Sequence, residues 1–109
     1  MQRMGTVIRL RPEHAAEYKR LHAAVWDDVL ATIAACHIRN YSIFLREPEN
    51  WLFASFEYHG SDFAADMARM AADPATQRWW ALTAPCQDPL PSRATGEWWA
   101  PMQEVFHTD

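Results

Sequence analysis

Glycine is scarce in this sequence, with only Gly5, Gly60 and Gly96 among its 109 residues. A phosphate-binding loop needs several glycines close together, because side chains there would keep the backbone N–H groups away from the phosphate. The three glycines lie far apart, so a nucleotide-binding loop of this kind is excluded. The Gly-x-Ser-x-Gly turn that carries the serine nucleophile of many hydrolases is absent too.

Cysteines and metal-ligand spacings are equally sparse. The two cysteines, Cys36 and Cys86, form no Cys-x-x-Cys motif, and the five histidines include no His-x-x-x-His pair that would bind zinc from one helix face. We therefore expect neither a metal nor a cofactor. Two isolated thiols are typical of a reducing compartment, which predicts a cytoplasmic protein.

Long runs of basic residues and long runs of apolar residues are also missing. The ten lysines and arginines are scattered among 14 acidic residues, and the net charge is −4, so we expect no nucleic-acid partner. No apolar run approaches the roughly 18 residues that span a bilayer, which predicts no membrane partner. Residues 1–5 lead directly into a strand pattern without the apolar core of a signal peptide, and this again indicates the cytoplasm.

The chain does contain enough apolar surface for one globular domain. Half of its residues are hydrophobic and 13% are aromatic, and 109 residues suffice for one core but not for two, so we expect a single domain over residues 1–109. Hydrophobic periodicity predicts a strand at 6–11, a helix at 12–36, a hairpin of strands at 38–46 and 51–58, a helix from 63 that is interrupted at 73–74, and a last strand at 102–107.

This βαββαβ order predicts a ferredoxin-like α+β fold, in which an antiparallel sheet carries its helices on one face. Thr6, Ile8 and Leu10 alternate along the first strand and share one of its faces. The strand at 51–58 carries large apolar groups on both faces, for example Trp51 and Leu52. Since an uncovered apolar sheet face is a common site of association, we expect a homodimer.

The first predicted helix carries a pair of hydrogen-bonding side chains on an apolar face. Tyr18 and His22 are four residues apart, so they lie one turn apart, and Val29 and Ile33 continue the same stripe. A neutral histidine bonded to a backbone carbonyl inside a core is the more common explanation for such a position. The neighbouring phenol favours a general acid or base, because imidazole both gives and takes a proton near neutral pH.

Aromatic residues elsewhere are candidates for a binding site. Trp79 and Trp80 point about 100° apart on a helix, so we expect one in the core and the other at a cavity. Indole rings pack against the C–H faces of sugars, although tryptophan is also a common core residue. Tyr41 lies in the middle of a predicted strand, where an ordinary half-buried aromatic is the simpler interpretation.

Several short segments, in this order along the chain, resemble one known family. They are Glu17-Tyr18, His22 and Trp26 in the first helix, Asn40-Tyr41-Ser42-Ile43 in the second strand, Gln77-Arg78-Trp79-Trp80, and Gln103-Glu104-Val105-Phe106 near the end. Each segment is short, but their joint order and spacing over residues 7–106 make the chain similar to the L-rhamnose mutarotases.

The resemblance implies a dimeric α/β barrel that interconverts the α and β anomers of L-rhamnose without cofactor or metal. It implies that His22 is the proton donor and that Tyr18, Tyr41, Trp79 and Trp80 bind the sugar. Opening the ring needs a base for the anomeric hydroxyl and an acid for the ring oxygen. We assign His22 to one of these roles, with the acid preferred, and leave the other to a carboxylate, a tyrosine or water.

Two further functions are compatible with the same fold. One is a cofactor-free monooxygenase, which rests on fold analogy alone, and the other is a sugar-binding module without catalysis. The segment at 95–101 departs from the family pattern, and it would act at the rim of the cavity or at the dimer contact.

Overall fold

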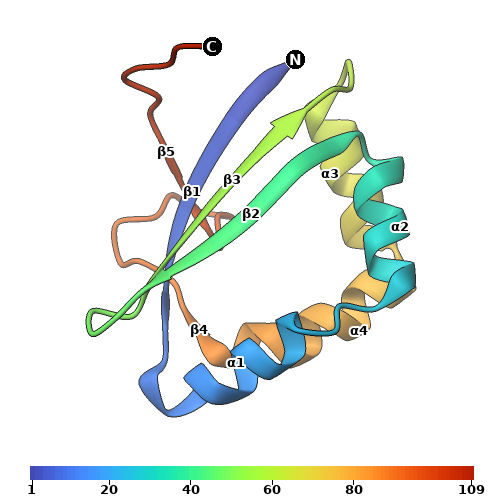
Figure 1. The fold of residues 1–109 in the computed structure, drawn as a ribbon. Coiled ribbons are helices and arrows are strands. Elements are labelled where there is room, and N and C mark those ends of the chain that lie inside the picture. Colours follow the sequence, from blue (N-terminus) through green and yellow to red (C-terminus); the bar gives the residue numbers. More distant parts are fainter.

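The computed structural model describes all 109 residues and confirms the predicted α+β class. The strands are β1 (Gln2–Leu10), β2 (Ile38–Arg46), β3 (Trp51–Tyr58), β4 (Gln87–Asp88) and β5 (Ala100–Met102). They form one antiparallel sheet in the order β2-β3-β1-β4, and β5 pairs with β1 as well. Figure 1 shows a strongly twisted sheet with all α-helices on one side of it.

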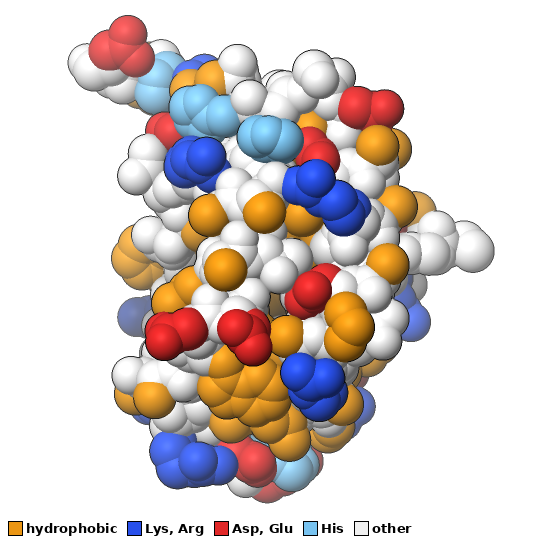
Figure 2. Space-filling view, turned by 90° about the vertical axis from the view of Figure 1, so that its right-hand side faces the viewer, with side chains coloured by type: hydrophobic (Ala, Val, Ile, Leu, Met, Phe, Trp, Pro, Cys, Tyr) orange, Lys and Arg blue, Asp and Glu red, His pale blue; other side chains and the backbone are white.

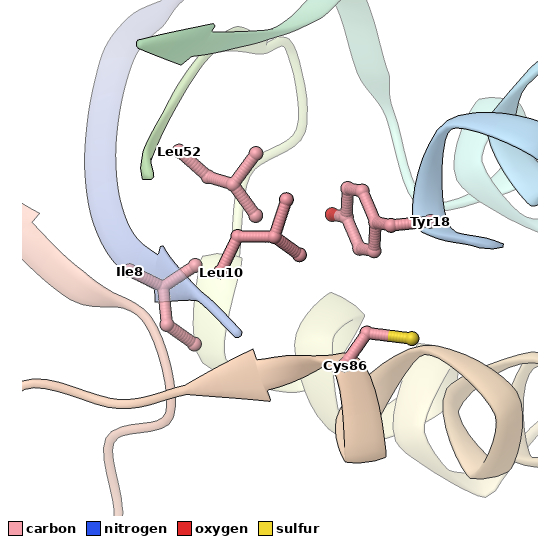
Figure 3. Close-up of a cluster of buried hydrophobic side chains, with 5 residues drawn as sticks. All are labelled: Ile8, Leu10, Tyr18, Leu52 and Cys86. Carbon is pink, nitrogen blue, oxygen red and sulfur yellow. The ribbon is translucent and has the colours of Figure 1, made fainter. Parts of the chain in front are cut away.

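The face of the sheet that meets the helices holds the main core. Ile8 of β1 lies opposite Leu52 of β3, and Leu52 lies opposite Leu45 of β2, so the three side chains point the same way. Ile8 and Leu52 are almost completely buried, and they cluster with Tyr18 and Cys86 (Figure 3). Ile8 and Leu10, which were predicted to share one face of the strand, therefore both lie in this core.

The opposite face of the sheet carries an apolar patch that nothing in the chain covers. Phe44 of β2 lies opposite Phe53 of β3, and the two residues are 64% and 38% exposed. The ring of Trp51 stacks on Phe53 with a centroid distance of 6.5 Å. We call Phe44, Trp51 and Phe53 the outer sheet patch.

The helix predicted at 12–36 was wrong in its continuity. The chain forms a short 3₁₀ turn at Pro12–His14, then α1 (Ala15–His22) and α2 (Asp27–Ala35), with a break between them. At the break Trp26 has an extended backbone, with φ −64° and ψ 140°, and its ring packs on Trp79 at 5.3 Å. Asp27 and Asp28 then favour a new helix start, because carboxylates stabilise the positive end of a helix dipole.

The second helical region is interrupted as predicted, into α3 (Phe63–Ala72) and α4 (Pro74–Thr83). Asp62 caps α3, since its side chain accepts a hydrogen bond from the backbone N–H of Ala65. Asp73 caps α4 by accepting from both the backbone N–H and the hydroxyl of Thr76, at 2.9 and 2.8 Å. Pro74 occupies the first turn of α4, where a missing N–H costs nothing.

The strand predicted at 102–107 was wrong in its position. β5 covers only Ala100–Met102, and residues 103–109 form no regular structure. The pairing with β1 runs from Ala100 opposite Val7 to Met102 opposite Gly5 and ends there, although β1 itself begins at Gln2. Beyond β5, Glu104 is exposed and forms a two-pronged ion pair with Arg3 at 2.8 and 3.0 Å.

Helices α2, α3 and α4 form one side of the molecule. Figure 2 shows this side with charges of both signs and with hydrophobic side chains gathered in its lower half. Large exposed hydrophobic residues on these helices are Leu30, Trp80 and Leu82. None of the helices has the length and apolar character needed to cross a membrane.

Candidate active site

A cavity of about 760 Å³ lies between the inner face of the sheet and the helices. Seventeen residues line it, and thirteen of them are hydrophobic. The cavity brings together all five candidate residues, which come from α1, β2 and α4: Tyr18, His22, Tyr41, Trp79 and Trp80. No carboxylate is among the lining residues, so a protein carboxylate is not available in the cavity wall for proton transfer.

His22 is the last residue of α1, and its ring has a defined protonation pattern. The Nδ1–H donates to the backbone carbonyl oxygen of Tyr18 at 2.9 Å. A carbonyl only accepts, so the proton of the neutral ring is on Nδ1 and the Nε2 lone pair is free. Burial lowers the pKa of His22 below 6.5, partly opposed by the bond to the carbonyl, and the ring is therefore neutral at pH 7.

Neighbouring aromatic rings hold the imidazole in place. The centroid of His22 lies 4.2 Å from that of Tyr18, with the planes tilted by 31°. On another side Trp79 meets the imidazole nearly edge-on, with a centroid distance of 5.3 Å and an angle of 67°. Trp79 packs in turn against Leu21 and Val29. Because these contacts fix the ring, Nε2 has a set position at the cavity.

The hydroxyl of Tyr18 belongs to a hydrogen-bonded chain that the sequence did not reveal. Gln87 of β4 donates from Nε2 to the Tyr18 hydroxyl oxygen at 3.2 Å, and Trp98 donates from Nε1 to Gln87 Oε1 at 2.8 Å. Burial raises the pKa of Tyr18 well above that of a free tyrosine, and the bond from Gln87 partly opposes this change. Tyr18 therefore stays protonated across the physiological range.

The remaining candidates form apolar and aromatic walls. Trp79 is 6% exposed and Trp80 is 42% exposed, so one is a core residue and the other is half open, as their spacing predicted, although both border the cavity. Tyr41 packs against Phe56 at 5.5 Å, and loss of hydration raises the pKa of its hydroxyl. Trp99, next to Trp98, adds to the wall, so the unusual segment at 95–101 lies at the cavity rim.

One group of possible metal ligands lies outside this cavity. Side-chain atoms of His14, Glu17 and Cys86 lie within 4.8 Å of one another. Cys86 is buried, its thiol donates to the Leu82 carbonyl oxygen at 3.6 Å, and burial raises its pKa, which disfavours the thiolate that a metal would need. None of the three lines the cavity, so this group does not bear on its chemistry.

Comparison with known proteins identifies the family. The family model described as "rhaM: L-rhamnose mutarotase" matches residues 3–108. The chain belongs to the L-rhamnose mutarotase family. A relative of that name from Phocaeicola vulgatus is 30% identical over 109 residues, which cover all of both chains.

Solved structures support the mutarotase fold. The crystal structure of L-rhamnose mutarotase FA22100 from Formosa agariphila matches with a TM-score of 0.78 and 22% identity, covering all of both chains. Tetracenomycin F2 cyclase from Streptomyces glaucescens, a type-II polyketide cyclase, matches with a TM-score of 0.69 and 15% identity over 99% of this chain and 96% of the cyclase. At these identities the two structures bear on the fold alone.

Proposed function

We propose that this chain is an L-rhamnose mutarotase, an isomerase that interconverts the α and β anomers of the sugar. The observation that carries the proposal is the neutral His22 in the cavity, with its Nε2 lone pair unpartnered and its Nδ1 proton held by Tyr18, in a chain of the mutarotase family. Ring opening and closing need only proton transfer, which is the chemistry that such a site offers.

The reaction begins with His22 as a base. Nε2 takes the proton of the hydroxyl on C1, the C1–O1 bond becomes a carbonyl, and the bond from C1 to the ring oxygen breaks as that oxygen receives a proton. The open aldehyde turns about its C1–C2 bond and recloses on its other face, with both protons returned. This order differs from the acid role preferred from the sequence, because a neutral ring with its proton on Nδ1 has none at Nε2 to give. The protonated ring acts as the acid when the sugar closes.

Tyr18 is the proposed acid for the ring oxygen. Its hydroxyl accepts from Gln87, and it stays protonated at neutral pH, so its hydrogen is available to a ligand. O1 and the ring oxygen are both bonded to C1, so a base and an acid that stand side by side on one helix can serve them together. A cavity without a carboxylate leaves the two tyrosines that line it, and of these Tyr18 stands beside His22, with ring centroids 4.2 Å apart.

Trp79, Trp80 and Tyr41 are proposed to hold the sugar ring. Indole faces pack against C–H groups, and a wall in which thirteen of seventeen residues are hydrophobic favours a methyl group over a hydroxyl at C6. This preference fits a 6-deoxy sugar such as L-rhamnose.

The single domain, the assembly and the location of the protein are also proposals. We infer one mutarotase domain over residues 1–109 and a homodimer formed through the outer sheet patch, since Phe44 and Phe53 lie exposed side by side. A cytoplasmic location is supported by the two unpaired thiols of Cys36 and Cys86.

Saturation-transfer NMR on equilibrated L-rhamnose tests the function directly. The protein should accelerate exchange between the two anomers well above the rate in buffer. L-mannose, which differs by a hydroxyl on C6, should exchange with a lower kcat/KM because the apolar wall offers that hydroxyl few partners. A protein that leaves both sugars at the buffer rate would refute the proposed activity.

A further inference from the structure

We propose that Gln87 and Trp98 are positioning residues that make Tyr18 donate its proton toward the cavity. Both residues line the cavity but lie outside the candidate set, and hydrogen bonds run from Trp98 to Gln87 and from Gln87 to Tyr18. The inference rests on the proposed mutarotase function, in which Tyr18 gives a proton to the ring oxygen.

The Gln87 amide has only one orientation that suits both of its partners. The indole N–H of Trp98 is a donor only, so the amide atom that faces it at 2.8 Å must be the oxygen. The NH₂ group of Gln87 then points the other way, toward Tyr18. The amide cannot turn over without leaving two donors facing each other, so one hydrogen bond fixes the direction of the next.

The orientation of this amide sets the direction of the Tyr18 hydroxyl hydrogen. Because Gln87 Nε2 donates to the hydroxyl oxygen, the hydroxyl hydrogen cannot lie along that bond. Tyr18 and Gln87 are only 4% and 5% exposed, and the Tyr18 hydroxyl donates to no other group of the chain. The hydrogen is therefore left for an acceptor in the cavity. A bond received from Gln87 also makes the O–H a better donor through cooperative polarisation.

Strand β4 and the loop that follows it bring these residues together. Gln87 lies in β4, opposite Leu10 of β1, and Arg9 holds this strand by donating to the backbone carbonyls of Asp88 and Pro89 at 3.4 and 3.2 Å. The loop after β4 returns to the sheet at β5, so that Trp98 comes back to Gln87. The site thus depends on a segment that holds none of the five candidate residues, although Gln87 and Trp98 line the cavity.

The substitution Gln87→Glu reverses the donor and acceptor in the hydrogen bond between residue 87 and Tyr18. Protonation of the introduced carboxylate at lower pH restores the native direction. When ionised, the introduced carboxylate accepts from Trp98 and also from Tyr18, which draws the Tyr18 hydrogen away from the sugar. When protonated, the introduced carboxyl group keeps its carbonyl toward Trp98 and donates to Tyr18, as the native amide does. The titratable side chains around this position are Tyr18, His22 and Tyr41 in the cavity wall and Cys86 and Asp88 on either side in the chain. Tyr18, His22, Tyr41 and Cys86 are neutral at pH 7. Asp88 pairs with Arg9 and Arg11 at 3.2 and 3.8 Å, and its side chain alternates with that of residue 87 along β4.

The test measures kcat and KM for L-rhamnose by saturation transfer with the full chain. At pH 8, Gln87→Glu and Gln87→Met should each lower kcat by about 10–100-fold with little change in KM. Trp98→Phe should cause a smaller loss, because the amide can then adopt both orientations. The deficit of Gln87→Glu relative to wild type should shrink as the pH falls from 8 to 6, whereas that of Gln87→Met should not.

Controls separate this inference from the proposed function and from loss of fold. Gln2→Met, at an exposed position at the start of β1, should leave kcat unchanged. Wild-type kcat in folded Gln87→Met, or a Gln87→Glu deficit that does not depend on pH, would overturn the positioning role while the mutarotase activity stands. If wild type fails to accelerate exchange, the proposed function fails and takes this inference with it.

Discussion

The chemistry of His22 follows from what surrounds its two ring nitrogens. One nitrogen is occupied by the carbonyl of its own helix, and the other is free at an apolar cavity. Partial burial removes hydration from the charged ring, so the neutral form is favoured. A neutral imidazole with a free Nε2 begins a reaction as a base.

The pH dependence of kcat/KM should report this state of His22. Because burial lowers its pKa below the ordinary 6.5, the neutral base persists as the pH falls through 6.5, and activity should decline only below that value. Exchange rates measured from pH 8 to pH 5, each corrected for the rate in buffer, provide the profile. An acidic midpoint at or above 6.5, or activity that rises on acidification, would contradict a neutral His22 base.

At this scale the sequence predicted some of the residues that meet at the cavity and not others. Tyr18 and His22 were predicted to lie together because a spacing of four places them on one helix face. The bonds from Gln87 to Tyr18 and from Trp98 to Gln87 were not predicted, because they join segments that are far apart or irregular in structure and leave no periodic pattern. The sequence also did not predict which ring nitrogen of His22 carries the proton, because this depends on a hydrogen bond to a backbone carbonyl.

The placement of the site residues depends on two interruptions in the helices. The break between α1 and α2 was not predicted, because the apolar stripe runs on through Val25 and Val29. A contact distant in sequence, between Trp26 and Trp79, accompanies the break. The break between α3 and α4 was predicted, because Asp73 and Pro74 are local signals for a helix start.

The cap of α4 offers a test at the scale of one element. Asp73→Ala removes the acceptor for the Thr76 N–H and hydroxyl, so it should lower the thermal midpoint by about 4–8 °C. Asp73→Asn keeps an acceptor oxygen, so its thermal midpoint should fall much less. Circular dichroism melting curves of the three proteins give the comparison, and equal midpoints for Asp73→Ala and wild type would show that the cap does not stabilise α4.

The whole molecule presents one covered and one uncovered face of the sheet. The sequence predicted this arrangement from strands that are apolar on both sides, and it also predicted the strand hairpin. It misplaced the last strand, which pairs with β1 only over Ala100–Met102. The tail beyond adds two exposed apolar side chains, Val105 and Phe106, 89% and 78% exposed.

A substitution in the outer sheet patch tests the proposed homodimer. Phe44→Lys places a charge beside Phe53 and should raise the dissociation constant of the dimer about tenfold or more. Leu82→Lys is the matched control, because it puts the same charge at an exposed apolar position on α4 that does not line the cavity. Sedimentation velocity over a concentration series gives the dissociation constants of wild type and of both variants, and a wild-type protein that stays monomeric at all concentrations would rule out the dimer.

The substitution His22→Asn tests most directly whether the cavity around His22 catalyses anomer exchange. The measurement is saturation transfer on L-rhamnose at pH 7.5, with melting curves to show that each protein is folded. We expect wild type to exceed the buffer rate and His22→Asn to lose about 10²–10⁴-fold in kcat. His59→Ala, at an exposed histidine, should match wild type. A folded His22→Asn with the wild-type rate would contradict the account.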